Sequence, residues 1–200
     1  MQTAQRKLLK SPPTEGRISH IDIHSSRRDE AESFIRGVFA RHYGATVTSF
    51  APQLLILEDR QRIVAAAGWR DARTETLFLE RYLDAPVEQA MAQLADQSVA
   101  RARLVEVGNL AADKPGGSLR VILALAARLD LLGYEWVVFT ATQELIGIFA
   151  RLGLPLLALS QADPARLGDE ARAWGRYYET QPVVVAGRIR RASERIGRPS

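Results

Sequence analysis

Apolar and polar residues alternate along the first half of the chain with two different periods. Ile18 to Ile23 alternates at every second residue, which is typical of a strand with one buried face. Between Ala31 and Phe39 the apolar residues recur at helical spacing, and Ser26 ahead of them has the side chain of an N-cap, with Asp29 three residues later. The pattern predicts a strand over 18–23, a helix from Ser26 to about His42 that Gly44 ends, and a hairpin of strands 53–58 and 62–69.

The second half alternates short apolar segments with longer ones. Leu119 to Leu132 is apolar nearly all round, which predicts a buried helix capped by Gly133. Pro86 suits the first turn of another helix. Residues 76–82 are apolar and aromatic, which fits a short strand or a strap across the sheet. The remaining pattern predicts strands over 104–110, 136–140, 154–159 and 182–189, a helix over 144–152, and a partly helical stretch over 164–178.

The order of these elements predicts a mixed α/β fold. The early strands pair as hairpins and the later ones are joined by helices, so we expect a central twisted sheet with helices on both faces. Residues 1–17 are polar and basic and include Pro12-Pro13, while the end of the chain is rich in arginine. The expected organisation is a flexible arm at 1–17, a single domain at 18–189 and a basic flexible tail at 190–200.

The composition excludes several kinds of chemistry. The 200 residues are 46% hydrophobic, enough for one core, and contain no cysteine, which rules out disulfides and thiol nucleophiles. The histidines His20, His24 and His42 lack the spacing of metal ligands, so no metal site is expected. No apolar run approaches the roughly 18–20 residues that cross a bilayer. Polar residues and prolines stand where a signal peptide would need apolar ones, so we expect a cytoplasmic protein without a transmembrane segment.

The net charge of +4 is carried mostly by arginine. Such a balance can attract nucleic acid or phosphorylated small molecules. Acidic residues are interspersed along the chain up to its last dozen positions, so we expect no nucleic-acid partner.

A glycine-containing loop, residues 111–118, leads from the strand at 104–110 into the apolar helix. A helix N-terminus carries unpaired N–H groups and the positive end of the helix dipole, and glycine lets a phosphate come close to them. The alternative is a plain tight turn, and the spacing matches neither a dinucleotide-binding fingerprint nor a P-loop. The residues expected to form a phosphate cradle are Lys114, Gly116, Gly117, Ser118, Leu119 and Arg120.

Glu106 is a candidate general base. It alternates with Val105 and Val107 on the strand that precedes the glycine loop. If burial raises its pKa toward the working pH, its carboxylate can take a proton from an amine nucleophile. The alternative is a solvent-facing residue or a partner of Arg103. Asn109, further along the same strand, is a candidate for orienting a substrate amide.

Two clusters rich in aromatic residues are candidates for the acceptor side of a site. Glu80 and Tyr82 lie in a dense aromatic and charged segment, which can line a pocket or form a strap pinned by a Glu–Arg pair. In the segment that begins at Trp174, a tyrosine hydroxyl can protonate a departing thiolate. Tyr177 and Tyr178 are therefore candidate acids and Trp174 a candidate pocket residue, with packing in the core or rim as the alternative.

A set of residues between about 43 and 187 forms a recognisable pattern: Tyr43-Gly44-Ala45, Pro52, Leu54, Gly68, Arg70, Leu77 to Glu80, Tyr82 to Asp84, Glu106 to Leu110, Phe139 to Thr142, Trp174-Gly175, Tyr177-Tyr178, Pro182 and Gly187. In these residues the chain resembles the thermostable hemolysin family. The same central region is similar to acyl-homoserine-lactone synthases, which are GNAT-like enzymes that use acyl carrier protein and S-adenosylmethionine. Those enzymes carry a Glu-x-Ser-Arg pattern where this chain has Glu106-Val107-Gly108-Asn109, without the Ser and Arg.

The resemblance implies a GNAT-like fold and a thioester acyl donor. It suggests an N-acyltransferase that moves an acyl group from acyl-CoA, or from the phosphopantetheine of an acyl carrier protein, to a small amine, with no permanently bound cofactor. The donor is expected against the strand that contains Phe139 and Thr140. Two other function classes stay open: a membrane-lytic protein, as the family name implies, and a scaffold that has the fold without the activity.

Overall fold

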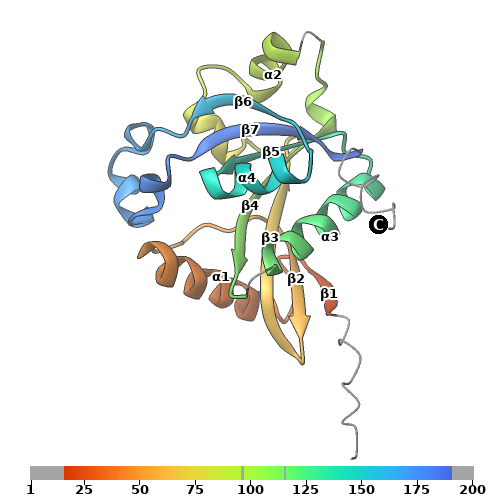
Figure 1. Cartoon of the computed structure of the whole chain (residues 1–200), viewed down its shortest axis with the longest axis vertical. Coiled ribbons are helices and arrows are strands. Elements are labelled where there is room, and N and C mark those ends of the chain that lie inside the picture. Colours follow the sequence, from red (N-terminus) through yellow and green to blue (C-terminus); the bar gives the residue numbers. More distant parts are fainter. Residues whose placement is uncertain (1–15, 96, 115, 191–200) are drawn as a thin grey trace, which may run out of the picture.

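A mixed sheet with the strand order β1-β2-β3-β4-β5-β7-β6 organises the chain (Figure 1). The computed structural model describes residues 16–95, 97–114 and 116–190. Strands β4 and β5 are parallel, and the other neighbouring pairs are antiparallel. The strands are β1 (Arg17–Ile21), β2 (Gln53–Asp59), β3 (Arg62–Asp71), β4 (Leu104–Ala112), β5 (Trp136–Ala141), β6 (Leu156–Gln161) and β7 (Val183–Arg188).

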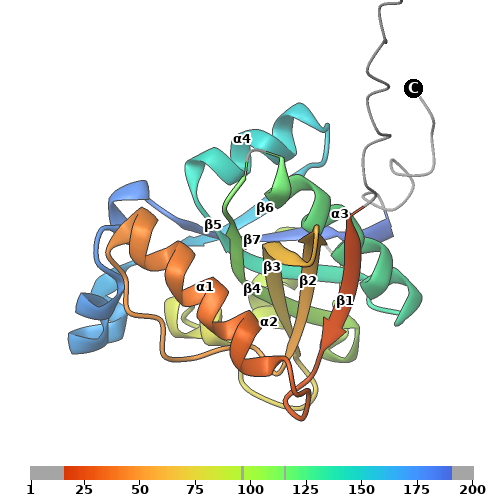
Figure 2. The same cartoon turned by 90° about the horizontal axis from the view of Figure 1, so that it is seen from below.

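Helices cover both faces of this sheet, as predicted from the order of the elements. Figure 2 shows α1 on one side, and α3 and α4 on the other. Alternation along β2 explains this arrangement, because Leu54 and Ile56 pack in the cluster beneath α1, whereas Leu55 and Leu57 pack in the cluster beneath α3. The helices are α1 (Arg28–Tyr43), α2 (Val87–Ala95), α3 (Gly117–Leu131) and α4 (Gln143–Arg151).

The ends of α1 were predicted with mixed success. Gly44 follows the helix with a φ of 66°, a left-handed conformation that glycine adopts readily, so the predicted end is confirmed. The predicted start is wrong, because Arg27 rather than Ser26 is the N-cap, and no side-chain hydrogen bond caps the helix. Instead, the hydroxyl of Ser25 accepts a hydrogen bond from the Arg27 N–H, and Asp29 and Glu30 place negative charge in the first turn.

Two other segments differ from their predictions. Residues 78–82 form a 3₁₀-helix, Phe78–Tyr82, rather than a strand, because carboxylates satisfy the N–H groups at its start. Helix α3 is apolar nearly all round, yet it buries only one face against the sheet, and Leu131 near its end is 85% exposed. Three further 3₁₀ segments are Arg101–Arg103, Pro164–Trp174, which has a kink at Gly168, and Tyr177–Thr180.

Strands β4 and β5 pair only at their beginnings. The pairing runs from Leu104 opposite Trp136 to Val107 opposite Phe139. Next on β4 comes a bulge against β3, at which Asn109 has a φ of 51°. Pairing between β4 and β5 thus ends just before the bulge, and this end of the pairing forms a fork in the middle of the sheet.

The predicted arm and tail fall mostly outside the described residues. Residues 1–15 and 191–200 are not described, and β1 begins at Arg17, within the segment predicted as the arm. No helix within the described residues is long and apolar enough to span a bilayer.

A carboxylate anchors the 3₁₀ segment 78–82 to its surroundings. Glu80 accepts hydrogen bonds from the N–H groups of Leu77 (2.8 Å) and Val87 (3.0 Å) and pairs with the guanidinium of Arg101 at 2.6 Å. The strap pinned by a Glu–Arg pair is thus present, although the arginine is Arg101, while Arg81 pairs with Glu170. These bonds and the Arg101 charge hold the pKa of the Glu80 carboxyl below its usual value, against the effect of burial.

We expect Glu80→Ala to lower the free energy of unfolding by about 3–5 kcal/mol, because it leaves the N–H groups of Leu77 and Val87 without their acceptor and removes the less exposed of the two carboxylates that pair with Arg101. Urea denaturation measures this loss. The control is Glu88→Ala, which removes the other, more exposed carboxylate on Arg101 and is expected to cost under about 1 kcal/mol. Equal losses in the two variants would show that Glu80 is no anchor.

Candidate active site

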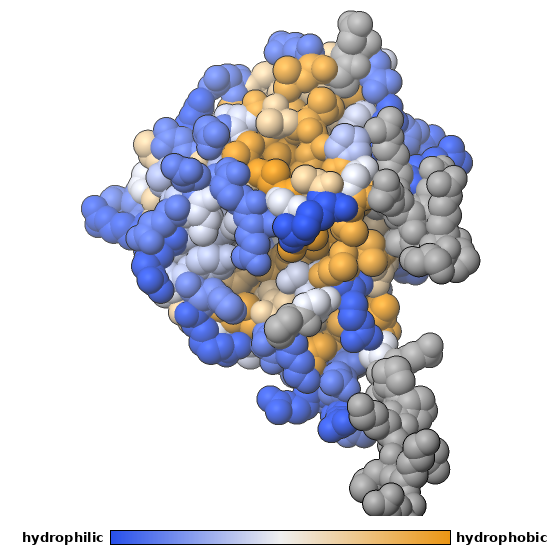
Figure 3. All heavy atoms as spheres, viewed as in Figure 1, coloured by the Kyte–Doolittle hydropathy of each residue, from blue (hydrophilic) through white to orange (hydrophobic). Residues whose placement is uncertain are grey.

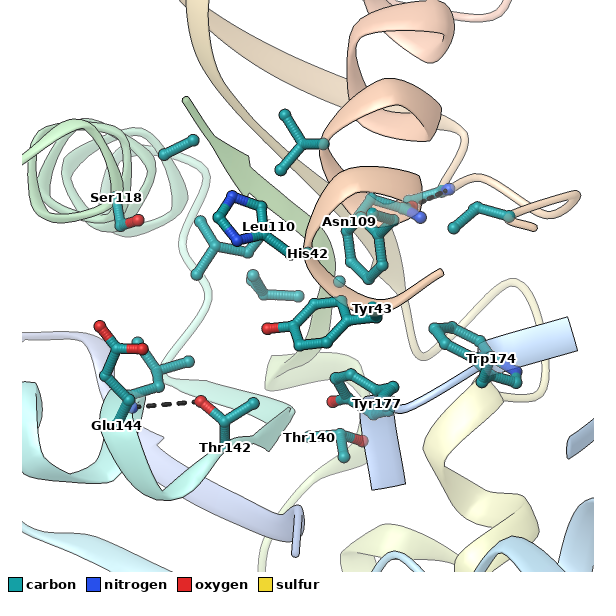
Figure 4. A pocket seen from close by; sticks show the side chains of 18 of the residues that line it. His42, Tyr43, Asn109, Leu110, Ser118, Thr140, Thr142, Glu144, Trp174 and Tyr177 are labelled. Carbon is teal, nitrogen blue, oxygen red and sulfur yellow. Dashed lines mark hydrogen bonds between the residues drawn. The ribbon is translucent and has the colours of Figure 1, made fainter. Parts of the chain in front are cut away.

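A cleft of about 790 Å³ lies at the fork between β4 and β5. This volume is in the range of small-molecule sites. Figure 4 shows the end of α1 with Tyr43 on one side, Ser118 at the start of α3 and Glu144 on α4 on the other, and Thr140 and Tyr177 near its base. The loop 46–51 and residues 170–177 complete the lining.

Glu106 lies inside the cleft and is only 6% exposed. Its carboxylate accepts hydrogen bonds from the N–H groups of Phe78 (2.8 Å) and Leu79 (3.0 Å), and its Oε2 lies 3.4 Å from Nε of Arg70. Burial raises the pKa of Glu106 to about 7, because the loss of water penalises the charged form more than Arg70 and the two N–H groups stabilise it. A carboxyl with this pKa can both accept and release a proton near neutral pH.

The alternative placement of Glu106, at the surface beside Arg103, does not occur. Arg103 instead donates a hydrogen bond to the carbonyl oxygen of Gly133 and lies 3.8 Å from Glu135. Because successive residues of a strand face opposite sides, Glu106 shares its face with Leu104, whereas Val105 and Val107 face α3.

The start of α3 forms another wall of the cleft. Gly116 has a φ of 79° and precedes the first helical residue, and Gly116, Ser118 and Leu119 line the cleft. The N–H groups of the first helical turn have no acceptor within the helix. Gly117 lies against the sheet, where a Cβ atom would come within 3.3 Å of the Ala112 side chain.

The two basic residues expected at this cradle are placed differently. Lys114 lines the cleft, and its ammonium group lies 3.2 Å from the carboxylate of Asp59. Arg120 stands outside the described lining of the cleft. Of the two, Lys114 therefore lies at the cleft beside the positive end of the α3 dipole, whereas Arg120 does not line it.

Aromatic rings form the opposite wall. The ring centroids of Tyr43 and Tyr177 are 5.3 Å apart, and the Trp174 centroid is 5.4 Å from that of Tyr177 and 5.8 Å from that of Phe78. In Figure 4, the hydroxyls of Tyr43 and Tyr177 point in the same direction, toward the side on which Glu144 lies. Burial, together with Tyr43 and Tyr178, raises the pKa of Tyr177, so its hydroxyl stays protonated and can donate a hydrogen bond.

The other predicted site residues fall around the cleft. The hydroxyl of Tyr82, which lines the cleft, lies 2.6 Å from that of Tyr178, which stands outside its described lining. Glu80 is also outside this lining, in the anchor of the 3₁₀ segment. Thr140 lines the cleft, while the ring of Phe139 packs 5.2 Å from that of Phe149 on the α4 side.

Asn109 lines the cleft, but its side chain is engaged by the protein itself. Its Oδ1 accepts a hydrogen bond from the N–H of Ala51 (2.8 Å), and its Nδ2 donates to the carbonyl oxygen of Ser49 (3.3 Å). Both ends of the amide therefore hold the loop 46–51 against the bulge of β4. Asparagine tolerates the positive φ that this bulge requires.

The contributors to the cleft that sequence reasoning missed include Arg70, Tyr43, the loop 46–51 and residues of α4 such as Glu144. Arg70 was visible as the charge that interrupts an apolar strand after Trp69, but its pairing with Glu106 depends on the register of β3 and β4. The loop gave no local signal. It is held by tertiary bonds, such as that from the Thr46 N–H to the carbonyl oxygen of Ala173 (2.6 Å).

Comparison with known proteins identifies both a family and a fold. A family model described as thermostable hemolysin matches residues 21–193. BjaI, a CoA-dependent acyl-homoserine lactone synthase solved with SAM and isopentyl-CoA, has a TM-score of 0.61 at 15% identity, over 92% of this chain and 91% of that one. TofI, solved in a ternary complex with an inhibitor and MTA, has a TM-score of 0.58 at 15% identity, over 86% and 91%.

A third structure, FeeM, is an N-acyl amino acid synthase from uncultured soil microbes. It has a TM-score of 0.55 at 12% identity, over 86% of this chain and 89% of that one. The comparison with curated protein sequences gives no match. At these identities the structures show a shared fold, and they confirm the predicted GNAT-like mixed sheet.

Substitutions of Asn109 test whether it holds the loop 46–51. Asn109→Gly tolerates the positive φ but loses both hydrogen bonds, whereas Asn109→Asp keeps the acceptor for the Ala51 N–H. We expect faster amide hydrogen exchange at Ala51 in the glycine variant and near-native exchange in the aspartate variant. Asn109→Ala should also lose roughly 1–2 kcal/mol more stability than the glycine variant, because alanine is strained at positive φ. Unchanged exchange at Ala51 in Asn109→Gly would refute this role.

Proposed function

This chain belongs to the thermostable hemolysin family, and on that premise we propose that it is an acyltransferase that moves an acyl group from a thioester donor to an amine. The observation that carries the proposal is the buried Glu106, with its pKa near neutrality, at the point where β4 and β5 separate. Glu106 and the start of α3 line the same cleft, so a proton acceptor and a site for phosphate open onto one space.

We assign the donor to the side of the cleft that α3 and α4 form. The N–H groups at the start of α3, around Ser118 and Leu119, suit the phosphates of CoA or of a carrier-protein phosphopantetheine. Unpaired edges of β4 and β5 beyond Val107 and Phe139 offer hydrogen-bonding groups to the amides of the pantetheine arm. The structural neighbour BjaI is CoA-dependent, which favours this donor class.

We assign the acceptor amine to the side lined by aromatic rings. A neutral amine nitrogen would attack the thioester carbonyl while Glu106, directly or through a water molecule, accepts its proton. Each carboxylate oxygen has two lone pairs, so Oε1 can accept a further hydrogen while it holds the Leu79 N–H. When the carbon–sulfur bond breaks, the hydroxyl of Tyr177, which lines the same cleft, would supply a proton to the thiolate. The hydroxyl of Tyr178 is hydrogen-bonded to that of Tyr82, and Tyr178 itself does not line the cleft.

The test is thiol release from acyl-CoA donors in the presence of a mixture of amino acids and other small amines. We expect Glu106→Gln to lower kcat/KM by about 10²–10⁴, the usual contribution of a general base. Because the base acts in its deprotonated form, wild-type kcat/KM should rise as the pH rises through about 7. The variant should lack this step while keeping any step that belongs to the amine.

The matched control is Glu58→Gln. Glu58 is another buried carboxylate paired with an arginine, Arg27, but it lies on β2 outside the lining of the cleft. We expect this variant to keep wild-type activity. Equal losses in the two variants, or no transfer with any donor by a folded wild-type protein, would count against the proposal and in favour of a scaffold.

Red-cell lysis separates the proposal from direct lytic action. Under the proposal, the purified chain alone releases no haemoglobin from red cells. Lysis that scales with protein concentration and is equal in wild type and Glu106→Gln would instead make the polypeptide itself the lytic agent.

A further inference from the structure

A second cavity, of about 90 Å³, lies between the sheet and the helices α3 and α4. Figure 3 shows apolar residues gathered on this face of the molecule. Residues from β4, β5 and the start of β6 form one side of the cavity, and residues from both helices form the other. The apolar side chains that line it are Val107, Leu110, Ile122, Leu125, Ala126, Leu129, Val137, Phe139, Leu145, Phe149, Leu154, Pro155, Leu156 and Ile189.

This apolar cavity adjoins the cleft. Five residues line both: Val107, Gly108, Leu110, Thr140 and Leu145. All five lie at or next to the fork where β4 leaves β5. A ligand group at the fork therefore lies beside both spaces.

The few polar residues in the lining of the cavity do not make it a polar site, so the cavity suits a hydrocarbon chain. Its lining includes Thr140, which also lines the cleft, and Arg188, which pairs with Trp136 at the start of β5. The guanidinium of Arg188 lies over the ring of Trp136, 4.1 Å from its centroid, and 3.7 Å from the carboxylate of Glu135, so its charge is engaged elsewhere. An unpaired polar ligand would lose its hydration here, whereas an aliphatic chain gains about 0.8 kcal/mol per buried methylene.

We propose that this cavity binds the aliphatic chain of the donor's acyl group, and that the protein transfers medium-chain acyl groups rather than acetyl. This inference rests on the proposed function and adds the class of donor. The thioester carbonyl would lie at the fork, with the chain toward α3 and α4 and the amine on the side of Glu106. In the transfer, the nitrogen–carbon bond forms as the amine proton leaves to Glu106, and the carbon–sulfur bond breaks as the thiolate takes a proton from Tyr177. Glu106 then returns a proton to Tyr177 through water. The products are an N-acyl amide and a free thiol, with no further reactant.

The geometry sets an approximate chain length. The lining of the cavity follows β5 from Thr140 back to Val137, three residues at about 3.3 Å each, or roughly 10 Å. With carbon–carbon bonds of about 1.5 Å in a zigzag, that length corresponds to roughly eight carbons. Octanoyl is therefore the chain expected to reach the far end of the cavity, with the carbons next to the thioester carbonyl still in the cleft at the fork.

Ala126 on α3 is the position at which a larger side chain would shorten the cavity. Ala126 lines the cavity and is partly exposed, so Ala126→Leu places a larger side chain in the space while keeping a good helix former. Ala127 is the matched control, since it is the next residue of the same helix, is also partly exposed, and stands outside the described lining. Thermal melts of both variants check that each is folded, and Ala126→Met is a second, more adaptable block.

The experiment compares acetyl-, butanoyl-, octanoyl- and dodecanoyl-CoA as donors for the full chain, with octanoyl-loaded acyl carrier protein as a second arm. For wild type, we expect kcat/KM to rise roughly tenfold for every two carbons up to octanoyl. Ala126→Leu should lower the octanoyl value at least about tenfold and leave acetyl and butanoyl unchanged, whereas Ala127→Leu should change none. Equal use of acetyl and octanoyl by wild type, or a uniform loss in Ala126→Leu, would overturn the inference.

Isothermal titration calorimetry with octanoyl-CoA and acetyl-CoA measures how much the longer acyl chain adds to donor affinity, and it does not depend on turnover. If no donor is turned over but octanoyl-CoA binds at least about tenfold more tightly than acetyl-CoA, and Ala126→Leu removes the difference, the proposed function fails and the cavity assignment stands. If transfer occurs with no preference for chain length in either assay, the function stands and the cavity assignment fails.

Discussion

The separation of β4 from β5 after Val107 is the feature on which the rest of the site depends. If the two parallel strands stayed paired, the middle of the sheet would be closed, and neither the cleft nor the apolar cavity would open onto a common point. The bulge on β4 is costly, because a non-glycine residue at positive φ is strained by about 1–3 kcal/mol. The two hydrogen bonds of Asn109 to the loop 46–51 offset that cost, so the same side chain stabilises the fork and holds one wall of the cleft.

The pleat of β4 then divides the space around the fork into two environments. Glu106 and Val107 are neighbours in sequence but face opposite sides of the sheet. On the side of Glu106, a short 3₁₀ segment supplies two N–H groups that hold the carboxylate, and the same segment carries Phe78 into the aromatic wall. On the side of Val107, the surroundings are apolar. The proposed reaction joins a polar nucleophile to an aliphatic acyl group and needs two such environments side by side, which the fork provides.

The sequence was sufficient for features with a local cause. Alternation along β4 put Glu106 on one face and its valine neighbours on the other, and glycine at position 44 marked the end of α1. The sequence was insufficient for features whose conformation depends on contacts between segments that are distant along the chain. The 3₁₀ segment 78–82 depends on carboxylates such as that of Glu106, 28 residues from Phe78, and the aromatic wall joins residues as far apart as Tyr43 and Tyr177. Ser26 has the side chain of an N-cap, but the turn before α1 places Arg27 at that position.

Helix α3 shows how a departure from a simple pattern can carry functional information. A helix that is apolar nearly all round is ordinarily buried on all sides, yet α3 buries only the side that carries Val121, Leu125 and Leu129. Its second apolar surface, with Ile122 and Ala126, faces the cavity beside α4. A solvent-facing surface of that kind costs free energy in the empty protein, whereas a surface that an aliphatic chain covers does not. Under the proposed function, α3 packs against the sheet with one side and against an acyl chain with the other. Both sides of the helix must then be apolar, which explains why its apolar residues extend beyond the side that faces the sheet.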